Sequence, residues 1–372
     1  ELDVSNNEIV CAGAIAAARL AASKQGFTTL NLNENYISDE GVEELKSVLV
    51  DAGIASVLGS LEENDADMAD YQLAKNAAKV LQEDFGKPFF MTVGFFRPHT
   101  PYVAPKAPYF GWYPESAMPI WPNIKQDQAD LPAAALGSYK KEQDKLTDTL
   151  RREALQAYYA SISFMDAQVG HVVDALDVNG LAENTIIVFT SDHGYHTGEH
   201  GLWQKQSLFE ESARVPLLIV APKVSQSGVV SNAPVSQVDL FPTLAALCDV
   251  QTPENIQGQS LVPMLSDPNE KGRGWALTQV VRRKGKGESF FGYSLRTPRW
   301  RFTEWDEGRQ GRELYDHDSD PDEISNLAEF KEHASTVVEL SEVLHNAIST
   351  TMPASGKTPE VDGSLWIPLL VP

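Results

Sequence analysis

The chain has 372 residues, of which 42% are hydrophobic, so it is long enough to bury the core of one large or two ordinary domains. Its formal net charge of -22 at pH 7 would repel phosphate backbones, which argues against nucleic acid as a partner. No run of the sequence approaches the ~20 apolar residues that a membrane span needs, so the composition indicates a globular protein.

The first pattern along the chain is an internal repeat near the N-terminus. The motif that begins at Leu2 recurs at Leu30, a shift of 28 residues (30 minus 2), and this period is typical of leucine-rich repeats. LDVSNNEI and LNLNENYISDEGVEELKSVL resemble the ribonuclease-inhibitor type of repeat, as in Ran GTPase-activating proteins. We therefore assign residues 1–58 to two strand-plus-helix repeats, which would offer a surface to a protein partner.

An acidic stretch, LEENDADMAD, follows the repeats and is predicted to be a junction at residues 59–70. Residues 71–81 then predict an amphipathic helix, and FFMTVGFF (89–96) predicts a buried strand. Residues 146–177 predict a long helix, and two further strands are expected in TIIVFT (185–190) and VPLLIVAP (215–222). Alternating helices and apolar strands favour an α/β fold with a largely parallel sheet that is covered on both faces.

The pattern becomes shorter beyond about residue 265. GYSLRTPRWRFTEW and RELYDHDSDPDEISNLA predict antiparallel hairpins followed by a final helix. We therefore expect an α/β core at residues 71–265 and a smaller C-terminal α+β subdomain at residues 266–372.

Polar residues directly follow the strand TIIVFT, where the ligand crevice of an open α/β sheet lies. Asp192 and His193 stand there on a turn that Gly194 closes. A carboxylate and an imidazole can both reach a divalent cation, and the carboxylate oxygen suits Ca²⁺ or Mg²⁺. Taken alone, an Asp-His-Gly triplet is more typical of a surface turn, so the surrounding residues decide between the two interpretations.

The surrounding string, TIIVFTSDHGYHTGEHGLWQKQSLFEESARVPLLIVAP, resembles the metal-binding stretch of type I sulfatases of the iduronate-2-sulfatase kind. Further blocks resemble the same family in the same order: VGFFRPHTPYVAP and YYASISFMDAQVGHVVDAL upstream, and VSQVDLFPTLAAL, IQGQSLVPML and ELYDHDSDPDEISNLA downstream. The resemblance spans about residues 67–350. It implies an alkaline-phosphatase/sulfatase-like sheet covered by helices.

The resemblance assigns roles to four residues. Asp192 and His193 match two ligands of the family's divalent cation, usually Ca²⁺. Lys205 matches the residue that contacts the sulfate and helps to neutralise or protonate the bridging oxygen. His99 matches the residue that stabilises the sulfate or acts as an acid toward the leaving group.

Weaker candidates stand near these positions. Tyr195 and His196 follow the ligand pair and would either form part of a sugar-binding rim or pack against the adjacent loop. His200, in GEHG, is expected to be a turn residue or to support the metal ligands from outside. Asp166 is expected to be structural.

The family's remaining catalytic groups have no counterpart in this sequence. A sulfatase uses an adjacent Asp pair and a formylglycine made from the Cys of a Cys-x-Pro/Ala-x-Arg motif, whereas Cys11 is followed by AGAIA. Without the formylglycine hydrate, no covalent route breaks the S–O bond. We therefore expect a sulfuric ester hydrolase for a sulfated carbohydrate such as a glycosaminoglycan, inactive as this isolated chain because an upstream segment is missing.

Two other functions stay open from the sequence. One is a leucine-rich-repeat binding protein with a degenerate sulfatase scaffold, and the other is a phosphate or phosphonate monoester hydrolase of the same superfamily. Two cysteines cannot form a disulfide framework, so composition leaves the compartment open. The family resemblance suggests a lysosomal, periplasmic or secreted protein.

Overall fold

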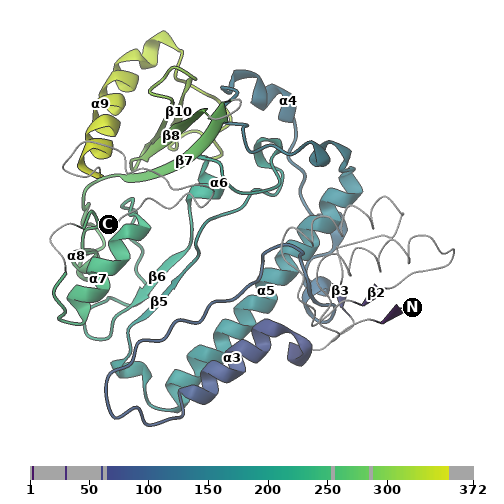
Figure 1. Cartoon of the computed structure of the whole chain (residues 1–372), viewed down its shortest axis with the longest axis vertical. Helices are drawn as coiled ribbons and strands as arrows, with labels where there is room; N and C mark the ends of the chain where they lie inside the picture. Colours follow the sequence, from purple (N-terminus) through teal and green to yellow (C-terminus); the bar gives the residue numbers. More distant parts are fainter. Residues whose placement is uncertain are drawn as a thin grey trace. The chain divides into compact units, whose positions relative to one another are not determined.

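The computed structural model describes residues 65–252, 256–284 and 288–351, together with three two-residue strands nearer the N-terminus (Figure 1). The chain forms two compact units. The first comprises residues 1–118 and 149–175, and the second comprises residues 119–148 and 176–372. No helix within the described residues is both long and apolar enough to cross a membrane.

The first unit is built on α5 (Asp148–Val178), of which residues 149–175 belong to it. Helix α3 (Ala69–Val80) lies beside α5, and the rings of Tyr71 and His171 meet edge to face with their centroids 5.7 Å apart. The shared apolar core contains Met68, Ala104, Tyr109, Ala160 and Phe164. The remaining elements are β3 (Ser60–Leu61), β4 (Ala104–Pro105), η1 (Asp65–Asp67), η2 (Tyr109–Trp112) and η3 (Glu115–Ala117), and β3 pairs with β4 in parallel.

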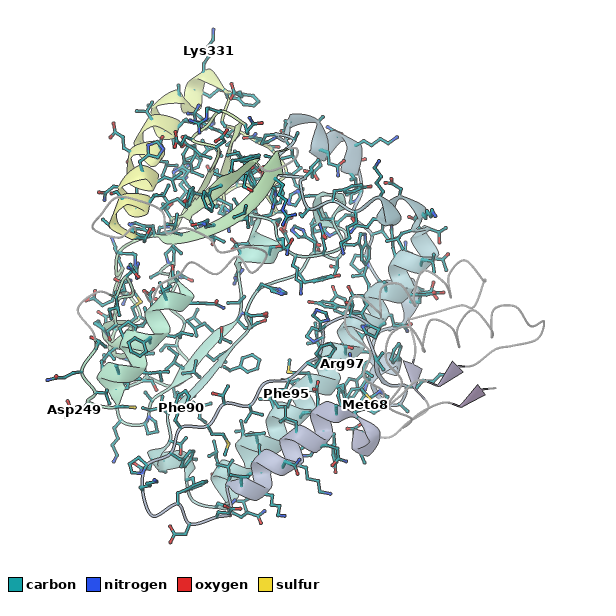
Figure 2. The ribbon with its side chains drawn as sticks, in the orientation of Figure 1. Met68, Phe90, Phe95, Arg97, Asp249 and Lys331 are labelled. Atoms are coloured by element: carbon teal, nitrogen blue, oxygen red, sulfur yellow. The ribbon has the colours of Figure 1, made fainter. Side chains whose placement is uncertain are left out.

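Residues 89–96 form no strand in the described part of the chain, which corrects the prediction of a buried strand there. Phe90 and Phe96 are 85% and 55% exposed, and Figure 2 labels Phe90 and Arg97 at the two ends of this segment. The amides of Phe96 and Arg97 donate to the carboxylate of Asp70 on α3, each at 3.0 Å. An apolar run favours burial but does not determine the hydrogen-bonding neighbour, and here a side chain supplies acceptors to these two amides.

Strands β5 (Ile187–Thr190) and β6 (Leu217–Val220) of the second unit pair antiparallel, with Ile187 opposite Val220. The predicted parallel arrangement is therefore wrong for this pair. The connection between the strands folds back on itself, and the Gly194 amide donates to the Ser212 carbonyl at 2.9 Å. A chain that returns directly beside itself must run antiparallel.

The smaller elements of the second unit surround this pair and the sheet that follows it. The α-helices are α4 (Ile124–Asp127), α6 (Glu210–Ala213), α7 (Leu240–Leu247) and α8 (Val262–Ser266). The 3-10 helices are η4 (Gln128–Asp130), η5 (Lys141–Lys145), η6 (Ala182–Asn184), η7 (Glu199–Gly201), η8 (Gln237–Asp239) and η9 (Lys331–His333).

A four-stranded antiparallel sheet, in the order β10-β9-β8-β7, forms the last part of the second unit, as the sequence predicts. Its strands are β7 (Ala276–Lys284), β8 (Glu288–Arg296), β9 (Trp300–Trp305) and β10 (Arg312–Asp316), and α9 (Ala334–Thr351) follows.

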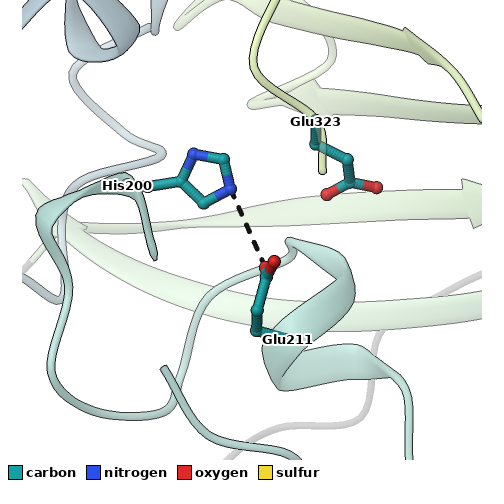
Figure 3. A group of neighbouring side chains, drawn as sticks. All are labelled: His200, Glu211 and Glu323. Carbon is teal, nitrogen blue, oxygen red and sulfur yellow. Dashed lines mark ion pairs between the residues drawn. The ribbon is translucent and has the colours of Figure 1, made fainter. Parts of the chain in front are cut away.

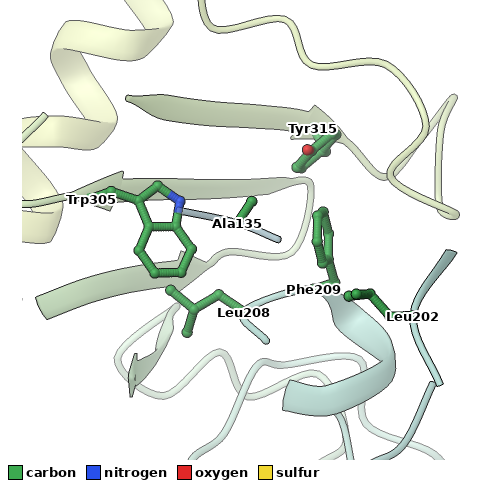
Figure 4. Packing of buried hydrophobic residues seen from close by; sticks show 6 residues of the cluster. All are labelled: Ala135, Leu202, Leu208, Phe209, Trp305 and Tyr315. Atoms are coloured by element: carbon green, nitrogen blue, oxygen red, sulfur yellow. The ribbon is translucent and has the colours of Figure 1, made fainter. Parts of the chain in front are cut away.

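Both faces of this sheet are covered, because successive side chains of a strand point to opposite sides. Phe302 of β9 packs toward α9, with Leu295, Leu314, Leu340, Leu344 and Ala347 in the same cluster. Trp305 and Tyr315 belong to a second cluster, which Figure 4 shows with Ala135, Leu202, Leu208 and Phe209. The second cluster anchors residues 202–209, which belong to the connection between β5 and β6.

Near the N-terminus, β1 (Leu2–Asp3) pairs with β2 (Leu30–Asn31) in parallel, and Leu2 stands opposite Leu30. This register has the same shift as the sequence repeat. The rest of residues 1–58 lies outside the described residues, so their assignment to leucine-rich repeats stays a prediction. The boundaries near residues 58, 70 and 265 stay predictions as well.

Candidate functional site

Asp192 and His193 lie on an exposed turn after β5. The Asp192 side chain is 84% exposed, and its Oδ2 lies 3.5 Å from His193 Nε2. His193 Nδ1 lies 2.7 Å from the Gly194 carbonyl, so in the neutral ring Nδ1 carries the proton and Nε2 keeps its lone pair. Two ligands at about 2.3–2.6 Å from a cation easily span this separation. The separation of these two atoms is short enough for both to reach one divalent cation.

Ser191 and Gln237 hold this turn in place. The Ser191 hydroxyl donates to the His193 carbonyl at 3.0 Å, and it also lies 3.3 Å from Asp192 Oδ1. The Gln237 amide, on η8, donates to the Ser191 carbonyl. The His193 amide donates to Asp192 Oδ1 at 3.0 Å, which leaves Oδ2 directed toward Nε2. These bonds restrict both candidate ligands before any cation binds.

Gly194 lets the turn approach α6 closely. A Cβ atom at this position would stand 1.9 Å from the Glu211 carbonyl oxygen and 2.8 Å from that of Arg214. Both are backbone atoms, so Gly194→Ala is expected to push α6 away and to destabilise the protein by about 1–3 kcal/mol. Urea unfolding followed by tryptophan fluorescence measures this change.

The matched control is Gly170→Ala, because nothing lies within 4 Å of a Cβ at that position of α5. Alanine in a helix interior is about 0.5–1 kcal/mol more favourable than glycine, so this variant is expected to be neutral or more stable. Equal unfolding midpoints for Gly194→Ala and the unmodified protein would contradict the close-approach argument.

Lys205 lies in the second half of the connection between β5 and β6. The backbone carbonyl groups of both neighbouring residues accept hydrogen bonds. The Gln204 carbonyl accepts the His196 amide at 2.8 Å, and the Gln206 carbonyl accepts Nη2 of Arg282 at 2.9 Å. Gln206 has φ 70, in the left-handed region that non-glycine residues seldom adopt. Such outliers persist where the surroundings impose them and are common at functional sites. The backbone at Lys205 is therefore tightly specified.

His99 belongs to the first unit, whereas Asp192, His193 and Lys205 belong to the second. Its Nδ1 lies 2.8 Å from the Thr100 carbonyl, and its ring lies 4.9 Å from that of Phe96. The convergence of His99 with the other three residues stays a prediction.

The two candidates for a sugar-binding rim differ in their surroundings. Tyr195 is partly buried, and its hydroxyl donates to the Trp203 carbonyl at 3.1 Å. His196 is fully buried, with Nε2 2.7 Å from the Ser207 hydroxyl. Burial, with the charge of His200 acting in the same direction, lowers the pKa of His196 to about 3. A buried neutral imidazole cannot reach a sugar, which corrects the rim assignment for His196 and supports the packing alternative.

A buried polar cluster beside these residues was not identified from the sequence. His200 Nδ1 lies 3.3 and 3.2 Å from the two carboxylate oxygens of Asp127, and its Nε2 lies 3.7 Å from Glu211 Oε2. Figure 3 shows Glu323 directed toward the same space. Asp127 and Glu323 come from segments distant in sequence, and no local pattern connects them to GEHG.

The pKa values of two residues in this cluster, His200 and Glu211, are raised above their ordinary values. Burial opposes a charged His200, but the hydrogen bond to Asp127 and the charge of Glu211 outweigh it and raise the pKa of His200. Burial raises the pKa of Glu211 to about 7, against the opposing effect of His200. Both groups therefore bind a proton more tightly than usual near neutral pH.

The cluster of His200, Glu211 and Glu323 is poorly suited to bind a metal ion. His200, Glu211 and Glu323 have ligand atoms within 4.8 Å of one another. Glu323, however, already accepts hydrogen bonds from Arg301 and lies 2.7 Å from His317 Nε2. The Arg301 guanidinium supplies positive charge there and would repel a divalent cation. The Asp192–His193 turn therefore remains the predicted cation site.

The sulfatase family model matches residues 3–250, and the model for the C-terminal part of N-sulphoglucosamine sulphohydrolase matches residues 198–350. Arylsulfatase K from Xenopus laevis is 33% identical over 261 residues, which cover 68% of this chain and 45% of that protein. A sulfatase from Formosa agariphila is 31% identical over 275 residues, which cover 73% of this chain and 52% of that protein. The chain thus spans about half the length of the curated relatives it matches.

Two solved structures have a similar fold. The structure of BT4656 in complex with its substrate D-glucosamine-2-N,6-O-disulfate is 23% identical, with a TM-score of 0.65, and covers 76% of this chain and 70% of that chain. The phosphonate monoester hydrolase of Agrobacterium radiobacter is 24% identical, with a TM-score of 0.71, and the match covers 87% of this chain and 72% of that chain. These likenesses support an alkaline-phosphatase/sulfatase-like α/β fold. The narrower likeness to iduronate-2-sulfatase stays a prediction.

Proposed function

The chain belongs to the sulfatase family, and we propose that it supplies the cation-binding and sulfate-binding part of a sulfuric ester hydrolase for a sulfated carbohydrate. The observation that carries this proposal is the Asp192–His193 turn. Its carboxylate oxygen and unprotonated ring nitrogen lie 3.5 Å apart at an exposed strand end, held there by Ser191 and Gln237.

The substrate class is proposed from two similarities. BT4656 was solved with a sulfated glucosamine as its substrate, and one matching family model describes an N-sulphoglucosamine sulphohydrolase. Both names describe sulfate on an amino sugar, which is a building block of glycosaminoglycans. We therefore propose a sulfated amino sugar, within the wider class of sulfated carbohydrates.

Each residue has a distinct role in the proposed reaction. Asp192 and His193 hold the cation, Ca²⁺ or Mg²⁺, which would offset negative charge on the sulfate oxygens. The Lys205 ammonium would bind the sulfate and stabilise the charge that develops on the bridging oxygen. His99 would donate a proton to the departing alkoxide.

The family's formylglycine motif and Asp pair are not present in these 372 residues. One carboxylate and one imidazole are well short of the 6–8 oxygen ligands that Ca²⁺ prefers. We propose that the 372-residue chain binds Ca²⁺ weakly and hydrolyses no sulfate ester, and that the reaction needs those groups from elsewhere.

The test compares the 372-residue chain with a complemented protein that also carries a sulfatase segment with the Cys-x-Pro/Ala-x-Arg motif. Only the complemented protein is expected to release sulfate from glucosamine 6-sulfate with Ca²⁺. Lys205→Ala in that protein is expected to lower turnover about 10²–10³-fold, the usual effect of removing one group that stabilises developing charge. Asp192→Ala is expected to weaken Ca²⁺ binding in calorimetry.

Lys331→Ala serves as the control, because Lys331 is exposed and projects away from the protein in Figure 2. It is expected to leave turnover unchanged. Turnover by the 372-residue chain that Asp192→Ala abolishes would contradict the proposal of an inactive chain. Equal losses in Lys205→Ala and Lys331→Ala would contradict the role of Lys205.

Phosphonate monoester hydrolysis is a second candidate, because a phosphonate monoester hydrolase is among the similar folds. Sulfate monoesters and phosphonate monoesters each carry one negative charge, so one cationic site can accommodate either. The complemented protein separates the two reactions when the phenyl monoester of a phosphonic acid and a sulfated glucosamine are compared at equal concentration. Faster turnover of the phosphonate would favour the second candidate.

A separate role concerns residues 1–58. We propose that they bind a protein partner as leucine-rich repeats, because Leu2 pairs with Leu30 in the register of the sequence repeat. Such units stack through parallel strands, one from each repeat.

A further inference from the structure

The connection between β5 and β6 is a folded loop that carries both halves of the proposed site. The Asp192–His193 turn stands at its start, and Lys205 lies on its returning arm. Three backbone hydrogen bonds of 2.8–2.9 Å cross the loop: Gly194 to Ser212, His196 to Gln204, and Gly198 to Leu202. The path of this loop therefore determines where Lys205 stands relative to the turn.

His200 lies at the tip of the loop, and its ring is turned inward. Its φ of 54 is in the left-handed region, which is uncommon for a residue other than glycine. The residue is 1% exposed, and its ring stacks on Phe209 with centroids 3.9 Å apart and planes at 15°. The Gln128 side chain donates to the His200 carbonyl at 2.7 Å. The surroundings thus hold a strained residue in one position.

The ring of His200 joins two separate helices. Nδ1 contacts Asp127 of α4 at 3.2 Å, and Nε2 faces Glu211 of α6 at 3.7 Å. Three buried atoms here have no hydrogen-bond partner: His200 Nε2, Glu211 Oε2 and His196 Nδ1, the last lying 3.9 Å from Glu211 Oε2. Unpartnered buried polar atoms are unfavourable unless charge compensates them. A protonated His200 provides that compensation, because Nε2–H then faces a carboxylate.

The groups around the ring also favour its protonated form. Four carboxyl groups face it from four different elements, and the nearest imidazole, that of His196, is neutral. The facing groups are Asp127 of α4, Glu211 of α6, Glu323 of the segment after β10, Glu313 of β10 and His196 of the loop itself. Glu323 is balanced by Arg301 and His317, whereas Asp127 and Glu211 have His200 as their nearest cation among the described residues.

We propose that His200 is a positioning residue whose imidazolium ties Asp127 to Glu211, and that this tie fixes the loop and thereby the place of Lys205. The tie follows from the buried geometry alone, and only its consequence for Lys205 rests on the proposed function. His200 contacts Asp127, faces Glu211 and stacks on Phe209, and we propose that it acts on Lys205 through the loop.

A dependence on pH follows from this tie. The pKa of His200 is raised and that of Glu211 is raised to about 7, so the folded loop holds protons more tightly than the unfolded chain. A raised folded pKa gives stability that is present below the unfolded value and lost as pH rises through the folded value. The two groups titrate as a coupled pair. The loop is therefore expected to loosen as pH rises from the ordinary values, 4.5 for Glu211 and 6.5 for His200, through the raised values of the folded loop.

Hydrogen exchange on the 372-residue chain tests the proposal without any enzymatic assay. The amides of Gly194, His196 and Gly198 report the loop, and those of β9 report global unfolding. After correction for the intrinsic rate, protection of the loop amides is expected to fall by up to about tenfold per pH unit while the opened loop has lost a proton that the closed loop still holds. It is expected to level off once the closed loop has lost that proton as well, while β9 stays unchanged.

Three variants distinguish charge from shape. His200→Gln is expected to show low loop protection at pH 6 and pH 9, and His200→Arg, which stays charged, is expected to show high protection at both. Glu211→Gln is expected to weaken the tie at both pH values and remains informative if His200→Gln fails to fold. In the complemented protein, kcat of the unmodified enzyme is expected to fall as His200 and Glu211 deprotonate at high pH. In His200→Arg, kcat is expected to show no such fall, while KM stays constant.

Several outcomes would overturn the proposal. Loop protection in His200→Gln equal to that of the unmodified chain would show that the imidazolium is not needed. A pH dependence that persists in His200→Arg would assign the titration to another group. If the purified chain contained one metal ion per molecule, and its removal by a chelator lowered loop protection at pH 6, a bound metal ion rather than a proton would hold the loop. A different outcome concerns the proposed function alone. If the loop amides behave as expected but the complemented protein releases no sulfate, the role of His200 in the loop is supported and only the proposed reaction is rejected.

Discussion

Arg301→Ala is expected to destabilise the protein by about 3–5 kcal/mol, which is the usual effect of leaving a buried charge without its partner. Arg301 is buried on β9, and its guanidinium forms ion pairs with Glu323 and Glu210. It also donates to the Ser294 hydroxyl at 3.2 Å. The Glu323 side chain is 0% exposed, so the variant would leave its carboxylate with His317 as the remaining ion-pair partner recorded among the described residues.

The pH dependence of this loss has a definite sign. Burial would raise the pKa of Glu323, but the charge of Arg301 and the hydrogen bond with His317 outweigh it and lower the pKa to about 2. A depressed pKa gives stability above the unfolded value and loses it as pH falls through the folded value. The difference in unfolding free energy between Arg301→Ala and the unmodified protein is therefore expected to be largest near pH 7. It is expected to shrink as pH falls below 4.5, the ordinary pKa of the Glu323 carboxyl group.

Urea unfolding at pH 7 and pH 4 measures both effects, and Arg299→Ala is the matched control. Arg299 precedes β9 by one residue and forms an ion pair with Asp316 at 2.6 Å, but its side chain is 53% exposed. Exposed pairs contribute little to stability because water screens them, so this variant is expected to lose much less stability than Arg301→Ala. Equal losses in the two variants would show that the buried network has no special contribution.

Trp305→Ala is expected to destabilise the protein by about 3–5 kcal/mol, because it opens a cavity in a closed core. Trp305 is 0% exposed and lies in the cluster that Figure 4 shows, between the sheet and residues 202–209. The Arg282 guanidinium lies 4.9 Å from the ring, and the indole Nε1 donates to Glu313 Oε2 at 2.5 Å. The substitution removes the packing and one hydrogen bond to a buried carboxylate together.

Trp305→Phe separates the two contributions, because phenylalanine keeps most of the ring but cannot donate to Glu313. Its loss is expected to be about 1–3 kcal/mol, the effect of leaving a buried acceptor with one partner fewer. The Tyr315 hydroxyl still donates to Glu313 Oε1 at 3.1 Å. Circular dichroism during thermal unfolding is the suitable measurement, because both variants alter tryptophan fluorescence. A Trp305→Phe variant as unstable as Trp305→Ala would contradict this division.

Local patterns predicted several of the helices and strands. The predicted helices at 71–81 and 146–177 correspond to α3 (Ala69–Val80) and α5 (Asp148–Val178), and TIIVFT contains β5. Helical period and β-branched runs are properties of neighbouring residues, so a sequence reveals them directly. The Asp192–His193 turn could be placed for the same reason, because it follows β5 immediately.

Pairing and burial could not be inferred in this way. The segment 89–96 is as apolar as β5 but forms no strand within the described chain, and β5 and β6 run antiparallel instead of parallel. His196 stands three residues after His193, yet one ring is fully buried and the other is partly exposed. Each outcome depends on what lies opposite the residue, and that partner comes from a different part of the chain.

The resemblance of the sequence motifs to the sulfatase family was enough to identify the family and to predict the two candidate cation ligands and the role of Lys205. The cluster of His200 with Asp127, Glu211 and Glu323 became visible in the folded protein, because it joins α4, the loop after β5, α6 and the segment after β10. Charge and hydrogen bonding act over a few ångströms of space, whereas sequence patterns report only neighbours along the chain. The tie that His200 forms is therefore a property of the fold, although each of its residues is ordinary where it stands in the sequence.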